Sequence, residues 1–362
     1  MAALLFPRHH VDAQLASGDG PVPTIRLFLA VSGSPAFPKP DPRSNSGDDN
    51  TYTVRILQCL NAKDDKEGEG GDEEADRIRK DGRTSNCRST KVFLAGLIRE
   101  IEGTVIETLV VCKVACGQLN FKRLSKEATF YTTSLMELQN KVVPEFFGFY
   151  TGTIEDSPIG IALLKYCGKP LSGTGHQFME LSEALRYQIY QAFAMIHRCK
   201  VVHNHIAERH VLCDHRGQIW IIDFGLSKKH REVCRLSQSD LKNVPNSDMD
   251  CTELENVIVD LDLCFTGDLF GVYVSDPANP PEEKALIEVA KMNGCPDASA
   301  AGRAIMFLLS FESWQNRRER LEPKAKELEE YFKYTGLPAE AEELLRSSTA
   351  ADVQGPLIVT SV

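Results

Sequence analysis

Apolar runs of strand length dominate the first half of the chain, and amphipathic stretches with helical spacing dominate the second. Between residues 181 and 200, for example, Leu185, Ile189 and Phe193 fall on one face of a helix. An order of strands, one helix among them, and then helices indicates an α+β protein. Predicted strands cover 24–31, 51–60, 91–98, 107–116, 145–151 and 159–166, and predicted helices cover 122–140, 181–200, 282–292, 301–312 and 314–334.

Two polar segments interrupt this pattern. Residues 32–50 are rich in Pro, Ser and Asp, which predicts a largely disordered N-terminal extension. Eight of the 13 residues from Asp64 to Asp76 are acidic, so we interpret the region around them as a flexible acidic insertion. The predicted organisation is an extension over 1–50, a sheet lobe over 51–166 with the insertion at 62–89, a helical lobe over 167–335 and a C-terminal tail over 336–362.

Composition narrows the class of partner. A formal net charge of −10 argues against nucleic acid or an anionic membrane as the main partner. No apolar run approaches the roughly 18 residues of a membrane span, and the N-terminal apolar stretch is too short for a secretory signal. The 11 cysteines lack paired Cys-x-x-Cys spacing. We therefore expect an intracellular protein with reduced thiols, cytoplasmic or nuclear.

The most specific chemical pattern lies between residues 203 and 225, HNHIAERHVLCDHRGQIWIIDFG. A polar loop follows a histidine, and an apolar strand then ends at Asp223-Phe224-Gly225. This spacing resembles the catalytic loop and Asp-Phe-Gly motif of the eukaryotic protein-kinase-like family. The resemblance covers roughly residues 51–265. It implies a two-lobed fold with a small antiparallel sheet lobe and a larger helical lobe, and it implies ATP with Mg²⁺ or Mn²⁺ as ligands.

The loop departs from the family at two functional positions. His205 stands where the family has its catalytic Asp, which accepts or orients the proton of the attacking hydroxyl. A neutral imidazole can act as a base, but it cannot supply the negative charge of a carboxylate. His210 replaces the metal-binding Asn, and imidazole suits Mn²⁺ better than Mg²⁺. The resemblance thus assigns catalysis to His205 and metal binding to Asp223 and His210.

Arg209 is a second candidate catalytic residue. The sequence Ala207-Glu208-Arg209 resembles the Ala-Ala-Arg of tyrosine-kinase loops, in which the arginine can neutralise the γ-phosphate. The pair Arg209-His210 also resembles some fungal kinase-like loops, written His-x-Asp-x-x-x-Arg-His. On that comparison His210 is a subfamily trait and His205 is the true departure.

Nucleotide-binding residues follow from the same resemblance. Lys113 ends a Val-Cys-Lys run similar to the family's Val-Ala-Ile-Lys strand, whose lysine holds the α- and β-phosphates of ATP. Glu127 on the next helix would pair with it, although Glu137 is an alternative and an ordinary surface pair is the simpler interpretation. Asp223 would also face the nucleotide. Adenine would meet backbone groups of Lys165, Tyr166 and Cys167.

Other motifs of active kinases are missing. The acidic insertion occupies the place of the Gly-x-Gly-x-x-Gly loop, and no Ala-Pro-Glu segment follows Asp223 at a suitable distance. We therefore interpret the chain as a pseudokinase, an interaction module for an unidentified protein partner that can still bind ATP. The alternative is an active atypical protein kinase that transfers the γ-phosphate of ATP to a protein hydroxyl.

Two further hypotheses concern metal and the C-terminal region. A zinc site could draw on the loop residues His203, His205, His210, Cys213 and His215, but in the kinase arrangement His203 turns inward toward Phe224. The stretch from 314 onward is charged, with an apolar stripe through Leu321, Leu328 and Phe332. That stripe predicts packing in the helical lobe, and a partner-binding helix is the alternative.

Overall fold

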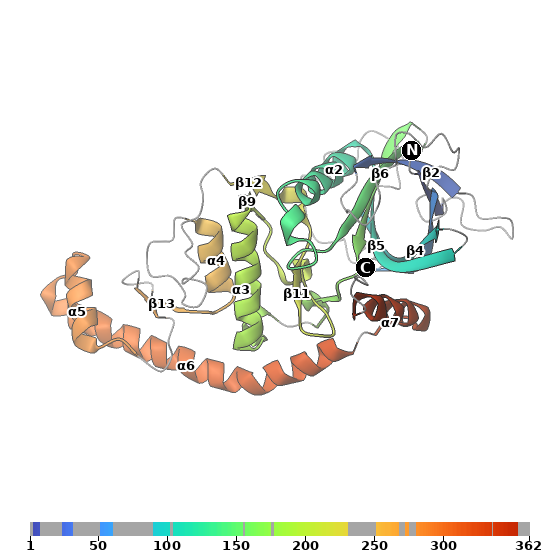
Figure 1. Ribbon diagram of the computed structural model, residues 1–362. Helices are drawn as coiled ribbons and strands as arrows, with labels where there is room; N and C mark the ends of the chain where they lie inside the picture. Colours follow the sequence, from blue (N-terminus) through green and yellow to red (C-terminus); the bar gives the residue numbers. More distant parts are fainter. Residues whose placement is uncertain are drawn as a thin grey trace, which may run out of the picture. The chain divides into compact units, whose positions relative to one another are not determined.

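The computed structural model describes residues 3–7, 24–31, 51–60, 90–101, 104–154, 156–174, 177–230, 251–267, 272–274, 280–334 and 336–353. The chain divides into two compact units (Figure 1). Unit 1 comprises residues 1–140, 144–166 and 336–362, and unit 2 comprises residues 141–143 and 167–335. The acidic insertion at 62–89 lies outside the described residues.

Unit 1 is built on a closed barrel with the strand order β1-β2-β6-β7-β5-β4-β3. Strands β1 and β3 are parallel, and the other neighbouring pairs are antiparallel. The α+β class with a small, mainly antiparallel sheet lobe is thus confirmed. The strands are β1 (Ala3–Pro7), β2 (Thr24–Val31), β3 (Thr51–Cys59), β4 (Lys91–Ile101), β5 (Thr104–Cys116), β6 (Phe146–Ile154) and β7 (Ser157–Lys165).

The segment expected as a largely disordered extension, residues 1–50, supplies two of these strands. Strand β2 coincides with the apolar run predicted at 24–31, and it pairs with both β1 and β6. Strand β1 pairs in turn with β3, so these two strands close the barrel. The remaining residues of the extension lie outside the described part of the chain.

Side chains along β5 point alternately into the barrel and away from it. Val110, Cys112 and Val114 belong to the buried interior cluster, whereas Lys113 points outward between them. Helix α2 (Gln118–Thr132) follows β5 directly and packs on β5, β6 and β7. This period of two therefore aims the lysine side chain at the helix that comes next in the sequence.

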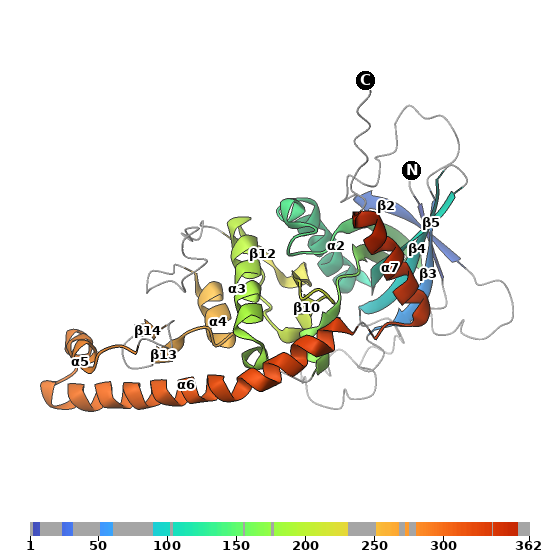
Figure 2. The same ribbon diagram turned by 60° about the horizontal axis from the view of Figure 1, so that its bottom comes forward.

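A second helix of unit 1 comes from the far end of the chain. Helix α7 (Ala339–Val353) lies along strands β4 and β5 (Figure 2). Ala341 is fully buried against Leu94 and Leu109, which point outward from the barrel. Arg55 on β3 bonds to Glu340 at 2.6 Å. The predicted tail over 336–362 thus contributes a helix to unit 1.

Unit 2 contains a central buried helix and several short strands. In helix α3 (Glu183–Arg198), Ser182 accepts the backbone N–H of Leu185 at 3.3 Å and so caps the N-terminus. Strand β9 (Val201–Val202) pairs with β12 (Lys228–Lys229). A three-stranded sheet joins β8 (Lys169–Pro170), β10 (Val211–Cys213) and β11 (Ile219–Ile221). Short 3₁₀ turns are η4 (Met136–Leu138) in unit 1 and η5 (Leu171–Thr174), η6 (Phe178–Glu180), η7 (Glu208–His210) and η8 (Phe224–Leu226) in unit 2.

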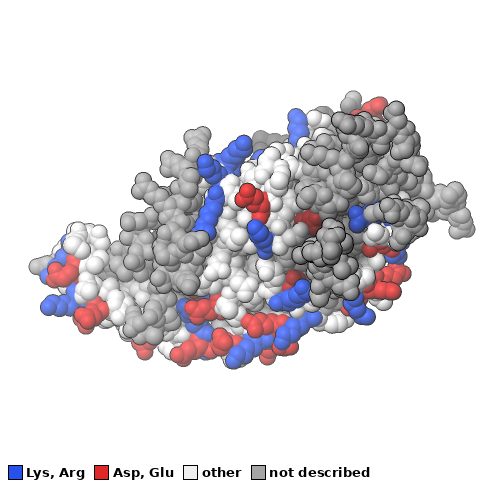
Figure 3. Space-filling view, viewed as in Figure 1, with Lys and Arg blue, Asp and Glu red and all other residues white. Residues whose placement is uncertain are grey.

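The rest of unit 2 is mainly helical. It contains α4 (Thr252–Asp260), the hairpin of β13 (Phe265–Gly267) and β14 (Val272–Val274), α5 (Glu283–Met292) and α6 (Asp297–Lys333). The two helices predicted at 301–312 and 314–334 are one helix of 37 residues. Acidic and basic side chains alternate along its solvent side (Figure 3). Among the described residues, no helix is long and apolar enough to cross a membrane.

Asp262, two residues after the end of α4, is bonded to helices α3 and α6 of unit 2. Its carboxylate accepts hydrogen bonds from Nε1 of Trp314 at 3.0 Å and from Arg317 at 2.7 Å, both on α6. Arg186 on α3 donates to the backbone carbonyls of Leu261 and Asp262, at 3.0 and 2.8 Å. Arg186 is buried, and these bonds satisfy its Nη1, whereas its Nε has no hydrogen-bond partner among the described residues.

Candidate functional site

Lys113 and Glu127 form an ion pair in unit 1. The Nζ atom of Lys113 is 2.7 Å from Oε2 of Glu127 on α2. Only 18% of the lysine side chain and 3% of the glutamate side chain are exposed, so this is not an ordinary surface pair. The alternative partner, Glu137, lies exposed on η4. A buried carboxylate therefore fixes the position of the ammonium group, which suits a lysine that binds phosphate.

The residues assigned to adenine recognition are the last residue of β7, Lys165, and the two that follow it, Tyr166 and Cys167. The backbone N–H of Lys165 donates to the carbonyl of Glu145 at 2.9 Å, so the protein already uses this donor. Gly168 follows with φ +102°, and a Cβ there would lie 2.3 Å from the carbonyl oxygen of Cys213. An adenine contact by this segment would have to use other backbone groups.

The polar loop of unit 2 lies between β9 and β10. His203 at its start packs edge-on against Phe224, with ring centroids 5.0 Å apart, and its Nε2 donates to the carbonyl of Ile222 at 2.9 Å. Pairing of β10 with β11 brings Asp223, at the end of β11, next to His210 at the end of η7. Asp223 has φ 71°, a left-handed conformation that side-chain residues seldom adopt outside functional sites and turns.

Arg209 is hydrogen-bonded to two histidines of this loop, His205 and His210. Its Nη2 lies 2.8 Å from Nε2 of His205, and its Nε donates to Nε2 of His210 at 3.2 Å. A guanidinium can only donate, so both Nε2 atoms act as acceptors. The nitrogen lone pair that His205 would use as a base is therefore engaged by Arg209.

His210 is held as a neutral imidazole. Its Nδ1 donates to the backbone carbonyl of His205 at 2.8 Å, and burial lowers the pKa of its ring to about 4. Its Nε2 lies 3.2 Å from Oδ2 of Asp223. Two lone-pair-bearing atoms thus lie side by side, and the Arg209 guanidinium supplies the positive charge beside them.

These donors fit a divalent cation of intermediate hardness. Ligand atoms of His205, His210 and Asp223 all lie within 4.8 Å of one another. A carboxylate oxygen with imidazole nitrogens suits Mn²⁺ better than Mg²⁺, which prefers oxygen ligands. His210 could bind such an ion through Nε2 only after Arg209 releases that nitrogen, because the atom has one lone pair.

Comparison with known families finds one match whose residues include both the loop and the ion pair. Residues 97–255 match a family model described as protein tyrosine and serine/threonine kinase. This segment is a protein-kinase-family domain. The match includes the Lys113–Glu127 pair, the polar loop and the start of α4, so the resemblance inferred from the sequence is confirmed over these residues. A comparison of the chain with curated proteins found no match.

Glu253 on α4 accepts hydrogen bonds from the backbone of the polar loop, and the sequence did not reveal this role. One carboxylate oxygen accepts the backbone N–H of His203 at 2.8 Å, and the other accepts the N–H of Asn204. Burial alone would raise the pKa of this carboxyl, but its hydrogen bonds to His197 and to both backbone N–H groups lower it. No local motif in the sequence links Glu253 to residues 203 and 204.

A second group of titratable residues lies beside Glu253. His197, His230 and Cys251 place their ligand atoms within 4.8 Å of one another. Burial opposes ionisation of both His197 and Cys251, yet their mutual hydrogen bond and those to Glu253 and His230 prevail. The pKa of the imidazole is raised, and the pKa of the thiol is lowered. The spacing of these residues along the chain gives no sequence signal.

The five loop residues considered for zinc do not all converge, although two of them, His205 and His210, do. Among the described residues, the groups able to hold a metal ion are those of His205, His210 and Asp223, and of His197, His230 and Cys251. Cys213 instead lies on β10 with its Sγ near the carbonyl of Asp214. His203 is turned toward Phe224, as the kinase arrangement predicts.

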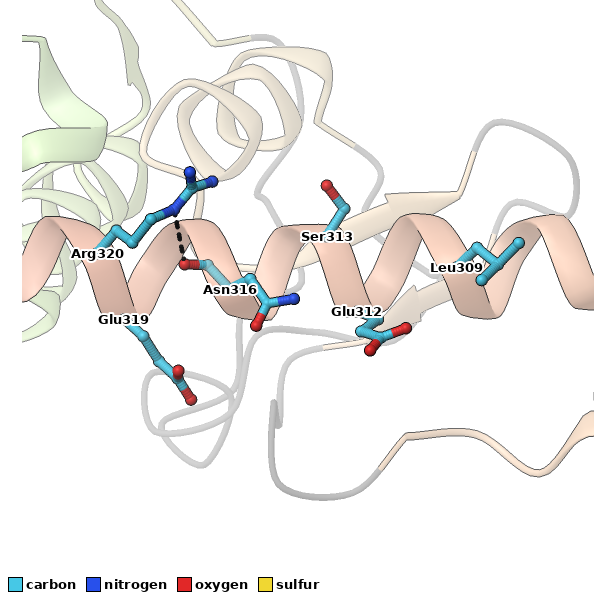
Figure 4. Close-up of a pocket in the computed structure, with 6 residues that line it drawn as sticks. All are labelled: Leu309, Glu312, Ser313, Asn316, Glu319 and Arg320. Atoms are coloured by element: carbon cyan, nitrogen blue, oxygen red, sulfur yellow. Dashed lines mark hydrogen bonds between the residues drawn. The ribbon is translucent and has the colours of Figure 1, made fainter.

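A hollow on the surface of α6 is separate from the residues predicted to bind nucleotide. Figure 4 shows its lining side chains, and the dashed line marks the bond of 3.2 Å from Nε of Arg320 to the carbonyl of Asn316. All of them come from one helix, and none is a residue that the sequence assigns to nucleotide binding or catalysis. They are Leu309, Glu312, Ser313, Asn316, Glu319 and Arg320.

Proposed function

We propose that the kinase domain is a pseudokinase that binds ATP with a divalent cation and transfers phosphate slowly or not at all. The observation that carries this proposal is the hydrogen bond from Arg209 to Nε2 of His205, which engages the nitrogen at the position of the catalytic base. As a pseudokinase, the chain would act by binding a protein partner. ATP binding would stabilise the partner-binding form of the domain.

Candidate nucleotide-binding residues occur in both units. In unit 1, Lys113 would bind the α- and β-phosphates, since Glu127 already holds its ammonium group. In unit 2, Asp223 and His210 would bind the cation, which neutralises phosphate charge. Mn²⁺ should serve better than Mg²⁺, because one of the two donors is a nitrogen. Arg209 would move toward the γ-phosphate when it releases His210.

Weak transfer follows from the chemistry of the loop. A neutral imidazole engaged by an arginine lacks both the free lone pair and the negative charge of an aspartate. General acid–base help is typically worth about 10²–10⁴ in rate. Positioning and charge neutralisation carry most of phosphoryl transfer, so residual activity at a low rate is compatible with these residues.

Thermal unfolding with nucleotide tests the binding part. The full chain should melt at a higher temperature with ATP and Mn²⁺, since ligand at a hundred times Kd adds about 2.7 kcal/mol of stability. Lys113→Ala should abolish the shift, whereas Lys126→Ala, an exposed lysine of the same region on α2, should retain it. Absence of any ATP-dependent shift with either Mg²⁺ or Mn²⁺ would overturn the nucleotide-binding proposal.

Phosphate transfer from radiolabelled ATP tests the catalytic part. The double variant His205→Asp/His210→Asn should transfer label to itself or to a mixed peptide substrate about 10²–10⁴ times faster than the wild type. Rapid transfer by the wild type itself would instead establish an active atypical kinase. A revertant that binds ATP but stays inert would mean that groups outside the loop limit the reaction.

A further inference from the structure

Three donor side chains converge in unit 2 beside Glu253. His197 lies in the last turn of α3, His230 follows β12, and Cys251 is the N-cap of α4. The Sγ atom of Cys251 lies 3.4 Å from Nδ1 of His197 and 3.5 Å from Nε2 of His230. Neither nucleotide binding nor phosphate transfer uses these residues.

We propose that His197, His230 and Cys251 bind a zinc ion. Zinc bonds to thiolate sulfur at about 2.3 Å and to imidazole nitrogen at about 2.0–2.1 Å, in tetrahedral geometry. Two such ligands on one ion are then about 3.5 Å apart, from those bond lengths and the tetrahedral angle. Both sulfur–nitrogen distances agree with this value without movement of the backbone.

Glu253 orients the first of these ligands. Its Oε2 lies 2.6 Å from Nε2 of His197, so Nε2 carries a proton and donates it. That bond leaves Nδ1 of His197 as the atom that faces the sulfur. Carboxylate–histidine–zinc arrangements of this kind fix the ring and raise the basicity of the ligating nitrogen. The backbone of His230 is held as well, since its N–H donates to the carbonyl of Lys200 at 2.8 Å.

Burial and charge also favour a metal over a reactive thiol. The His197 side chain is 0% exposed and Cys251 is 6% exposed, which leaves a substrate no direct approach to the sulfur. A thiolate and the Glu253 carboxylate together balance the charge of one divalent cation. Sulfur and imidazole ligands select zinc over magnesium or calcium. His230 is only half-buried, so the fourth ligand would be water on its side.

Such a site would join α3, the end of β12 and the start of α4, next to the carboxylate that bonds to the polar loop. Because Glu253 bonds both to His197 and to the backbone of the loop, zinc would stabilise the loop through that carboxylate. The role is structural. It does not depend on ATP binding or on transfer.

The test begins with the full-length wild-type chain, stripped with chelator and then loaded with Zn²⁺ or Co²⁺. One equivalent of Zn²⁺ should bind and raise the melting temperature. The Co²⁺ form should show thiolate-to-metal charge-transfer absorption and the intense visible bands of a tetrahedral ion. The other candidate group, His205, His210 and Asp223, contains no sulfur, so the charge-transfer band alone separates the two sites.

Variants then locate the site. Cys251→Ala and His230→Asn should each lose the metal and the absorption band. The matched controls Cys264→Ala, another buried cysteine of unit 2, and His210→Asn should retain both. Failure of the wild type to bind stoichiometric Zn²⁺, a Co²⁺ complex without a thiolate band, or a band that survives Cys251→Ala would overturn the proposal. The wild-type spectrum decides the matter even where a variant does not fold.

Discussion

Nε2 of His205 lies 2.8 Å from the guanidinium of Arg209, four residues further along the same loop. The same guanidinium donates to Nε2 of His210 at 3.2 Å. One arginine thus engages the histidine at the base position and the histidine at the metal position. Whatever draws Arg209 away, a γ-phosphate above all, would release both nitrogen atoms together.

Removal of Arg209 should make His205 more reactive. Arg209→Ala frees the Nε2 lone pair, and a hydrogen bond of about 0.5–1.5 kcal/mol corresponds to about a 2- to 10-fold change in availability. The measurement is the rate of carbethoxylation by diethyl pyrocarbonate, followed by peptide mass spectrometry. Arg216→Ala, a change in the exposed turn after β10, is the matched control and should leave the rate unchanged. Equal rates for His205 in all three proteins would contradict the bond.

Replacement of Glu253 should lower the free energy of unfolding more than replacement of Glu255 on the same helix. Glu253→Ala leaves the backbone N–H groups of His203 and Asn204 and the ring of His197 without their acceptor, which should cost about 3 kcal/mol. Glu253→Gln keeps one acceptor oxygen and should cost less. Urea unfolding measures both. Glu255→Ala, two residues further on, should cost under about 0.5 kcal/mol, and a similar loss for it would refute this role.

Acid should destabilise unit 2 before its carboxylates titrate. Burial lowers the pKa of His203 and lowers the pKa of His210 to about 4, while an unfolded imidazole titrates near 6.5. Below pH 6.5 the unfolded chain therefore binds protons that the folded chain does not. The stabilisation that comes from these two neutral imidazoles is fully present above that pH and is lost as the pH drops toward 4.

For His210 alone the loss between pH 7 and pH 5 should be about 2 kcal/mol, because each pH unit below 6.5 is worth about 1.4 kcal/mol. Urea unfolding of the chelator-treated chain at pH 7, 6 and 5 measures it. His210→Asn removes one of the two buried imidazoles and should weaken the dependence of the unfolding free energy on pH. An identical slope for wild type and variant would show that this ring is not held neutral.

Packing should hold α7 on the barrel more strongly than charge does. Ala341→Glu places an unpaired carboxylate against Leu94 and Leu109 and should cost about 3 kcal/mol or more. Glu340→Ala breaks only the pair with Arg55, whose side chains are 67% and 42% exposed, and should cost under about 1 kcal/mol. Amide exchange on β4 and β5 reports the difference. A larger effect of Glu340→Ala would reverse this ranking.

The sequence predicted those parts of the fold whose signal is local. Apolar periodicity placed α3 at 181–200, against an observed Glu183–Arg198, and strand character placed β3, β4 and β5 within a few residues of their observed ends. The spacing from His203 to Asp223 gave the loop and the strand that follows it. Each of these features is a run of consecutive residues, so one window of sequence contains the whole pattern.

Features that depend on distant partners could not be predicted in this way. The apolar run at 24–31 was visible as a strand, but its place between β1 and β6 was not. Ala341 and Leu94 are in contact although they lie far apart in the sequence, and neither belongs to a motif. The residues His197, His230 and Cys251 come together only because α3, β12 and α4 pack side by side. A site whose residues come from three separate elements has no fixed spacing in the sequence, so no sequence pattern predicts it.

The return of α7 to unit 1 affects how the protein can be made. Residues up to 166 complete the barrel strands, but Leu94 and Leu109 stay uncovered until Ala341 has been synthesised, 175 residues after Tyr166. At about 5–20 residues per second, a ribosome needs on the order of 10–35 s to add that length. During this interval the nascent chain presents an apolar stripe that a chaperone could recognise. A protein that ends before residue 336 would lack α7, so Leu94 and Leu109 would stay exposed. Such a protein should aggregate.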